Sequence, residues 1–329
     1  MEKEKSLIFK GSDKMFDKEY PHLEQYGQAI LQNFWIPEHF NYDRDVTDFK
    51  INLSPKEQKA IKRTVLMISQ IENKVKNMWS RIDMRLPHVT IANTGHIFAM
   101  NEVVHQNSYK MMLDKLGLRY DFDKLSKIPV VKGRVEYLSK YLEGVNSASD
   151  KEFTKSLILF TLLIENTALF SYFAIIASMN KYKNVFNNFS SIVSTTGREE
   201  VLHGQFGAEL IKIIREENPE WFDKEMEEKI YRNARKALEC EEEIIDWVFE
   251  EGEFDFLTKE NIKHYLRERF NVSLEQIGYK PIFEVKEEEV EKLRFFERSV
   301  NTSIQFDFFN EKSGDYNQSS KVKEDDWDF

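Results

Sequence analysis

The chain has 329 residues, 32% of them charged, with only 12 glycines and 7 prolines. This composition is typical of long helices with solvated outer faces, in one large domain or two small ones. The net charge of -10 argues against nucleic acid as a partner, because binding phosphates requires a basic face. No run of about twenty uncharged apolar residues and no signal-peptide core are present, which predicts a cytoplasmic protein without a membrane partner. A single cysteine, Cys240, excludes an internal disulfide framework.

The N-terminal part of the chain predicts two helices. Apolar residues recur at the spacing of one buried stripe over about 22–34, and Trp35 at the end of this helix is by periodicity alone a core residue. The sequence Ser54-Pro55-Lys56-Glu57 predicts the start of the second helix, with serine as N-cap, proline at the first position and glutamate closing a capping box. This helix is expected to run to about Arg85 and to carry Glu72.

The next predicted helix covers about 90–116 and ends at Gly117. It carries Glu102 and His105, and Tyr109 follows one turn later on the same face, about 6 Å further along the axis. Tyr109 is thus a candidate neighbour of the two, and the alternative is a core tyrosine with a hydrogen-bonded hydroxyl. A connecting region with a short helix follows and ends near Gly144.

Two further long helices are predicted in the second half of the chain. The first, over about 150–179, carries Glu165 and is apolar on nearly all sides, which predicts a central position in the fold. The second, over about 185–218, carries Glu200 and His203, and Gly197 predicts a local distortion just before them. Helices over about 221–250 and 259–277 have acidic outer faces and are expected to be scaffold.

Two pairs of residues in these helices define a candidate site. Glu102 and His105 are three positions apart, so their side chains leave the same helix face within about 6 Å of each other. Glu200 and His203 repeat the spacing. Each of the two helices therefore presents one carboxylate and one imidazole to a common point.

Glu72 and Glu165 add two carboxylates in otherwise apolar helical runs. Burying a charged carboxylate is expensive unless it is paired or bound to metal, and four of them in one core would repel. A pair of metal cations resolves this conflict, and the set matches the ligands of ferritin-like dimetal carboxylate proteins. The alternative, that these side chains lie on solvated faces or form ion pairs, does not explain Glu165, which has apolar neighbours on nearly every side.

The character of the chain changes at about residue 310. Gly, Ser, Asn and charged residues dominate from there and predict disorder, yet the chain ends in Trp327 and Phe329 among acidic residues. An acidic tail with aromatic anchors is typical of a peptide that docks into a groove on a partner. We therefore divide the chain into a helical domain, 1–309, and a docking tail, 310–329.

Taken together, these features closely resemble the small (beta) subunit of class I ribonucleotide reductase over nearly the whole chain. The resemblance is carried by the segment Phe34-Trp35-Ile36-Pro37-Glu38, by Glu72, Glu102, His105, Tyr109, Glu165, Arg198, Glu199, Glu200 and His203, and by the tail ending Asp326-Trp327-Asp328-Phe329. It implies an all-α, ferritin-like helical bundle that forms a homodimer. It also implies that two metal ions, held by the four glutamates and two histidines of the candidate site, react with an oxygen species to make a stored one-electron oxidant.

The resemblance further implies how this oxidant reaches a partner. Tyr109 occupies the place of the family's radical tyrosine, and Trp35 that of the tryptophan that leads the electron hole away from the site. Glu199 stands where many relatives have an aspartate that bridges this tryptophan to a ligand histidine. Tyr316 matches the tail tyrosine that relays the hole to the large (alpha) subunit, where ribonucleotides are reduced to deoxyribonucleotides. The last residues then form the docking peptide for that subunit.

One position departs from many relatives, which have aspartate where this chain has Glu72. Some branches of the family share the glutamate: one replaces the radical tyrosine and uses a manganese–iron pair, and another keeps a tyrosine and stores the oxidant on two manganese ions. The presence of Tyr109 favours two manganese ions, while an iron pair or a mixed pair stays open because oxygen-rich ligand sets suit both metals. Dioxygen, superoxide and a flavoprotein activator all stay open as the source of the oxidant.

Two other functions are alternatives. A two-metal ligand-binding oxidase would share the six ligands but has no need of a docking tail. The non-enzyme alternative is iron storage or a structural bundle; storage needs a shell of many short subunits, and a chain of 329 residues with a long acidic tail fits this poorly.

Overall fold

The computed structural model describes residues 7–11, 15–72, 75–142 and 144–301. Within these ranges all regular structure is helical, apart from one isolated β-bridge between Phe254 and Leu257. The prediction of an all-α fold is therefore confirmed. The last predicted segment, the tail over 310–329, lies outside the described residues.

The helices follow one another along the chain with short connections. The α-helices are α1 Leu7–Lys10, α2 Glu24–Gln32, α3 Tyr42–Thr47, α4 Pro55–Glu72, α5 Lys76–Trp79, α6 Val89–Leu116, α7 Arg119–Lys124, α8 Pro129–Leu142, α9 Asp150–Phe160, α10 Phe170–Lys183, α11 Asn187–Glu217, α12 Lys224–Val248, α13 Lys259–Gln276 and α14 Glu287–Val290. A π-helix, η7 Thr161–Ala168, joins α9 to α10. A last helix covers 294–301.

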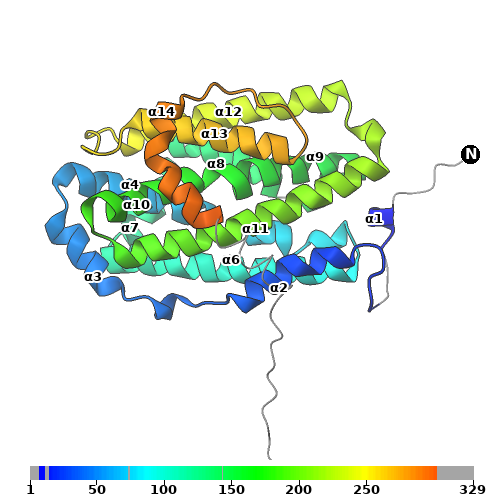
Figure 1. Cartoon of the computed structure of the whole chain (residues 1–329), viewed down its shortest axis with the longest axis horizontal. Helices are drawn as coiled ribbons and strands as arrows, with labels where there is room; N and C mark the ends of the chain where they lie inside the picture. Colours follow the sequence, from blue (N-terminus) through cyan, green and yellow to red (C-terminus); the bar gives the residue numbers. More distant parts are fainter. Residues whose placement is uncertain (1–6, 12–14, 73–74, 143, 302–329) are drawn as a thin grey trace, which may run out of the picture.

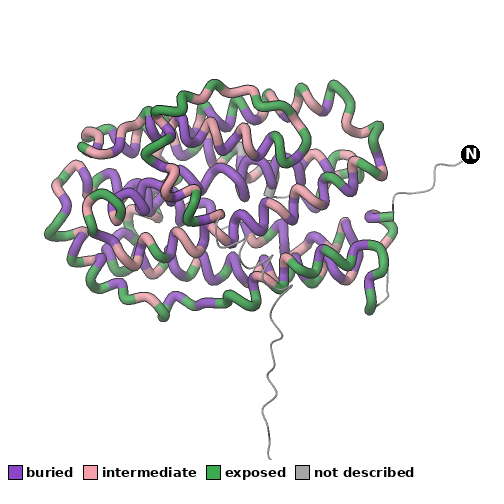
Figure 2. The backbone as a smooth tube through the Cα atoms, in the orientation of Figure 1, coloured by how far each residue is buried: buried purple, intermediate pink, exposed green. Residues whose placement is uncertain are grey.

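The bundle is elongated, and its two longest helices, α6 and α11, run along its length (Figure 1). α4 packs on both α6 and α10, and α10 packs on α11, so these helices surround the middle of the molecule. α2 covers α6 from one side, while α12 and α13 lie on the other side of the bundle (Figure 1). The buried residues concentrate on the inner helices (Figure 2).

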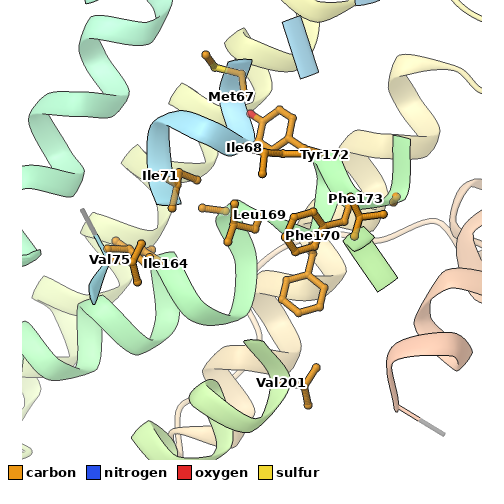
Figure 3. Packing of buried hydrophobic residues seen from close by; sticks show 14 of the residues in the cluster. Met67, Ile68, Ile71, Val75, Ile164, Leu169, Phe170, Tyr172, Phe173 and Val201 are labelled. Atoms are coloured by element: carbon orange, nitrogen blue, oxygen red, sulfur yellow. The ribbon is translucent and has the colours of Figure 1, made fainter. Parts of the chain in front are cut away.

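The stretch Asp150–Lys183 is the central element of this core. By length and composition it could cross a membrane, but its most apolar window is completely buried by the other helices, which is the position of a core helix. α10 packs its large side chains against α4 in the middle of the bundle (Figure 3). Met67, Ile68 and Ile71 of α4 and Leu169, Phe170 and Tyr172 of the central stretch belong to this cluster.

Several predicted helix ends agree with the structure. Gly117 ends α6 in the left-handed conformation, with φ 74°, which glycine adopts without strain. Glu57 accepts hydrogen bonds from the backbone and the hydroxyl of Ser54, both at 2.8 Å, as a capping glutamate does. Ser149 caps α9 by accepting from the backbone N–H of Glu152.

Two predictions about helix shape were wrong. The helix expected to run from Ser54 to Arg85 is not continuous: α4 is described as far as Glu72, and beyond the undescribed residues 73 and 74 the chain continues in the short helix α5 and a 3-10 turn over Ile82–Met84. Gly197 causes no distortion, because α11 remains α-helical throughout. This glycine instead gives room to the helix over 294–301: a Cβ added there would lie 2.9 Å from Cγ1 of Val300.

Candidate metal centre

The structure brings the six predicted ligands together in the middle of the bundle. They form two overlapping groups, Glu72, Glu102, His105 and Glu200 in the first and Glu102, Glu165, Glu200 and His203 in the second. Within each group the candidate ligand atoms lie within 4.8 Å of one another. Glu102 and Glu200 belong to both groups, so the arrangement is that of two adjacent metal positions bridged by two carboxylates.

Four helical elements contribute these side chains. α4 ends at Glu72, α6 carries Glu102 and His105, the π-helix η7 carries Glu165, and α11 carries Glu200 and His203. None of the six side chains is more than 1% exposed. Helix spacing therefore accounts for the two glutamate–histidine pairs, and helix packing brings the other two carboxylates to them.

The polar atoms of this cluster fit metal ions better than they fit one another. Both carboxylate oxygens of Glu72, Glu102 and Glu200 lack a hydrogen-bond partner in the structure, as does Nδ1 of each histidine. Buried polar atoms without partners are rare in folded proteins, since each costs free energy. Here they converge on two points, and carboxylate oxygens with imidazole nitrogens are suitable donors for manganese and iron.

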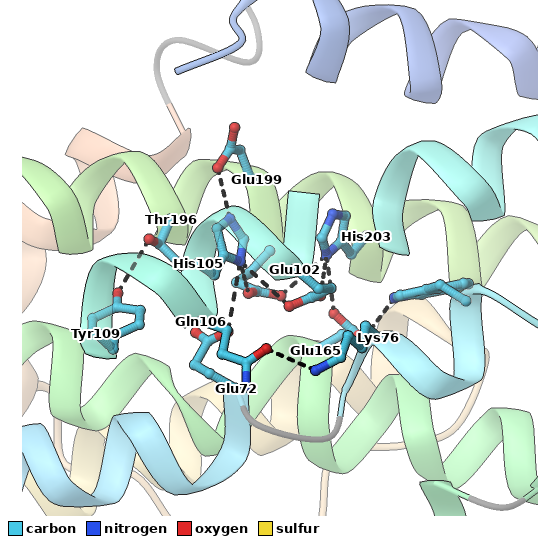
Figure 4. A network of polar contacts seen from close by, with 12 residues as sticks. Glu72, Lys76, Glu102, His105, Gln106, Tyr109, Glu165, Thr196, Glu199 and His203 are labelled. Carbon is cyan, nitrogen blue, oxygen red and sulfur yellow. Dashed lines mark hydrogen bonds and ion pairs between the residues drawn. The ribbon is translucent and has the colours of Figure 1, made fainter. Parts of the chain in front are cut away.

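Each histidine turns Nδ1 toward the carboxylates (Figure 4). Nδ1 of His105 lies 3.2 Å from an oxygen of Glu200 and 3.4 Å from one of Glu102. Nδ1 of His203 lies 3.0 Å from an oxygen of Glu102 and 3.4 Å from one of Glu165. The two imidazoles therefore approach the carboxylates from equivalent positions, one in each group.

The protonation of the cluster reflects its burial and its crowding. Burial, together with nearby carboxylates, raises the pKa of Glu72 and of Glu165 well above the usual range of glutamate. Burial opposes ionisation of Glu200 too, but the contacts with both histidines outweigh it and lower its pKa. For His105 and His203, burial acts to lower the pKa, yet the surrounding glutamates raise it well above the usual value. The metal-free cluster thus retains protons that metal binding would displace.

A hydrogen-bonded chain leads from the first group to Trp35, in the segment that follows α2. Nε2 of His105 lies 2.8 Å from Oε2 of Glu199, and Nε1 of Trp35 donates to both oxygens of Glu199 at 3.0 and 3.1 Å. Because a carboxylate accepts, the proton of His105 belongs on Nε2, which leaves the lone pair of Nδ1 facing the site. Trp35 is 6% exposed, and Glu199 is 4% exposed.

Tyr109 is completely buried one helical turn beyond His105. Its hydroxyl donates to Oγ1 of Thr196 at 3.1 Å, so it pairs with α11 and has no hydrogen bond to Glu72 (Figure 4). Burial and the charge of Glu72 raise the pKa of Tyr109 well above its usual value. The phenol is therefore neutral at physiological pH, which is the form that loses an electron and a proton together.

Trp79 is a contact of the site that the sequence interpretation missed. Its Nε1 donates to Oε1 of Glu165 at 3.0 Å, and its ring lies 6.2 Å from that of His203. The sequence held a partial signal: on the single helix predicted over 54–85, Trp79 stands seven residues after Glu72 and so on the same face, although in the structure Trp79 belongs to the separate helix α5. The other predicted functional residue, Tyr316, lies outside the described residues.

The comparisons with known proteins agree with this geometry. The family model described as ribonucleotide reductase, small chain, matches residues 12–291. A ribonucleoside-diphosphate reductase subunit beta of Halalkalibacterium halodurans is 24% identical over 317 residues, which cover 94% of this chain and 89% of the relative.

Solved structures share the fold. The ribonucleotide reductase R2 subunit of Clostridium botulinum superposes with a TM-score of 0.76 at 22% identity, over 84% of this chain and 88% of that one. The dimanganese(II)-NrdF of Streptococcus sanguinis gives 0.70 at 15% identity, over 88% and 99%. An R2-like ligand-binding oxidase with a Mn/Fe cofactor gives 0.67 at 20% identity, over 80% and 95%. With the family model covering most of its length, the chain belongs to the family of ribonucleotide reductase small chains.

Proposed function

We propose that this chain is the small (beta) subunit of a ribonucleoside-diphosphate reductase, which generates a one-electron oxidant and passes it to the large subunit. The observation that carries the proposal is the pair of carboxylate–histidine groups sharing Glu102 and Glu200. Two bound metal ions would supply the chemistry that turns an oxygen species into a stored oxidant. The protein holds these ions, excludes water from them and provides an outlet for the oxidising equivalent.

Manganese is our preferred metal, with two ions per chain. Glu72, with both oxygens unpaired, supplies a longer carboxylate at the position where many relatives have aspartate. The donor set of four carboxylates and two imidazoles is hard and oxygen-rich, so it accepts iron pairs and mixed pairs as well. The solved dimanganese and Mn/Fe relatives have the same fold.

The outlet is supported by an asymmetry between the two histidines. Nε2 of His105 contacts Glu199, which accepts from Trp35, whereas Nε2 of His203 has no hydrogen-bond partner among the described residues and packs against Phe98 at 4.2 Å between rings. Among the described residues, the histidine of the first group is therefore linked through a carboxylate to a tryptophan, and the histidine of the second group is not. We assign the path from His105 through Glu199 to Trp35, and from there to Tyr316 of the tail.

The partner is the large subunit, with the tail over 310–329 as its docking peptide, and we propose a cytoplasmic homodimer as the working form. A flavoprotein is a candidate activator of a dimanganese site. The R2-like ligand-binding oxidase shares the fold of this chain. At 20% identity, this likeness supports a common fold but not a common function. The family model and the acidic, aromatic tail favour the reductase.

The state of Tyr109 can be read from the low-temperature electron paramagnetic resonance spectrum of active protein. Because its phenol is buried and hydrogen-bonded only to Thr196, we expect a dimanganese signal that survives Tyr109→Phe. A narrow organic signal that disappears in this variant would instead assign the stored oxidant to the tyrosine. Metal analysis of the same samples is the control, since the substitution leaves all six ligands in place.

The role of the tail is testable without disturbing the bundle. We expect that Tyr316→Phe, or removal of the last twenty residues, abolishes nucleotide reduction with the large subunit and leaves the metal content unchanged. Tyr316→Phe isolates the relay, because it keeps the docking residues Trp327 and Phe329. Full reductase activity in the truncated protein would contradict the proposed partner and path.

A further inference from the structure

The π-helix η7 depends more than an α-helix does on stabilising contacts from its surroundings. It spans Thr161–Ala168 and holds Glu165, the one ligand of the second group that comes from neither α6 nor α11. A π-helix bonds residue i to i+5, and such segments persist only where the surroundings stabilise them. The hydroxyl of Thr167 donates to the carbonyls of Leu162 and Leu163, both at 3.0 Å, so part of this stabilisation is local.

Arg269 of α13 supports the same segment from outside. Its Nε and Nη2 donate to the backbone carbonyl of Asn166 at 3.0 and 2.8 Å, directly beside Glu165. Nη1 pairs with Glu297 at 2.9 Å, and the guanidinium carbon lies 3.7 Å from the centre of the Phe170 ring. The side chain is 5% exposed, so it is fixed by these contacts rather than by solvent.

Arg134 of α8 supports the end of the segment. Its Nη2 donates to the carbonyl of Ala168 at 3.1 Å and its Nη1 to that of Met67 at 3.2 Å, which ties the π-helix to α4. Nε pairs with Glu241 at 2.9 Å, and this carboxylate also accepts from Tyr172. Arg134 is completely buried, where a charge is stable only with such partners.

The opposite side of the π-helix is shaped by two glycines of α11. A Cβ at Gly204 would collide with the side-chain amide of Asn166, and one at Gly207 with the hydroxyl of Thr161. The wide helix therefore fits between α11 on one side and the two arginines on the other. Converting one turn to α-helix would rotate its two ends relative to each other by one residue, about 100°, so Glu165 and the anchored ends could not all keep their places.

We propose that Arg134 and Arg269 are positioning residues that hold η7 in its π-helical form and thereby keep Glu165 in the second metal position. This inference rests on the proposed metal-binding role of the site. For Arg269, whose backbone partner is Asn166 of η7, it predicts an effect on the second position alone, because the four residues of the first group come from α4, α6 and α11. Arg134 also contacts α4 through Met67, so Arg269 is the residue to test.

The test is equilibrium dialysis of Arg269→Met against Mn²⁺. We expect the wild-type chain to bind two ions and the variant to bind the second ion ~10- to 100-fold more weakly, as is typical when a group that orients a ligand is lost. Arg269→Lys, which restores one donor, should recover part of the affinity. Adding Glu72→Ala to the variant should remove the remaining ion and so assign it to the first group.

Arg63→Met is the matched control. Arg63 is also buried, but its partners are the carbonyl of Trp247 in α12 and the carboxylate of Glu250 just after it, rather than the carbonyls of η7. This variant should bind two ions with unchanged affinity. Equal affinities in the Arg269 variants, with folding confirmed by circular dichroism, would overturn the positioning role. If Arg269→Met does not fold, the affinity of Arg269→Lys for the second ion is compared with that of the wild-type chain. A weaker affinity then supports the positioning role, and an equal affinity overturns it. A wild-type chain that binds no metal would instead sink the proposed function.

Discussion

Replacing Glu102 with alanine is expected to empty both metal positions. Glu102 is shared by the two groups, so its loss removes a donor from each of the two metal positions. Glu72→Ala and Glu165→Ala should each lose one ion, since each residue belongs to a single group. Metal content per chain after dialysis, measured on protein of verified helicity, separates these outcomes.

The exposed Glu239 of α12 provides the control for this series. Glu239→Ala removes the same carboxylate from a solvated face and should keep two ions. A Glu102 variant that binds one ion with unchanged affinity would show that this residue serves a single position, and the bridged arrangement would then be wrong.

Replacing Trp35 with phenylalanine is expected to leave the metals bound and to lower nucleotide reduction ~10- to 100-fold or more. The substitution keeps an aromatic ring but removes the N–H that Glu199 accepts, and phenylalanine is far harder to oxidise than tryptophan. The measurement is turnover with the large subunit, together with metal content and the spectrum of the stored oxidant.

Trp221→Phe is the control for the tryptophan prediction. Trp221 lies in the 3-10 turn Pro219–Trp221 after α11 and packs against Phe9 at 5.7 Å between ring centres. Its substitution should leave turnover unchanged. Normal activity in Trp35→Phe would show that the oxidising equivalent leaves the site by another route, and the chain from His105 through Glu199 would then be structural.

Much of the site could be predicted because its spacing is local. A glutamate and a histidine three residues apart share a helix face. The two pairs in α6 and α11 therefore follow directly from the prediction of these two helices. Glu165 was identifiable because a charge in a fully apolar run requires an explanation. The boundaries that come from turn chemistry, such as Gly117 after α6, were also predictable.

The features that were missed depend on contacts between distant parts of the chain. Nothing in the run Thr161–Ala168 marks a π-helix. All of its residues are buried, so the sequence shows no alternation of buried and exposed faces that a change of helix type would interrupt. The break between α4 and α5 was hidden because the residues from Lys76 to Arg85 remain compatible with a continuous helix.

The two arginines were hidden for a related reason. Arg134 lies in the connecting region, and Arg269 lies in a helix that we took for scaffold with a charged outer face. A buried arginine and a solvated one look the same in a sequence, because burial is decided by the neighbouring helices. Only the structure shows that these guanidinium groups end on the carbonyls of Ala168 and Asn166.

The small size of Gly197 has a consequence for how the two subunits meet. Because Val300 packs there, the last described helix is fixed to α11, the helix that carries Glu199, Glu200 and His203. Fifteen residue steps separate Asn301 from Tyr316, and an extended chain covers at most ~3.6 Å per step, so Tyr316 lies within ~54 Å of the end of this helix. If the tail docks as we propose, this tether gives the bound large subunit an effective concentration of millimolar order, and a weak direct contact between the two subunits is then enough to align them for electron transfer.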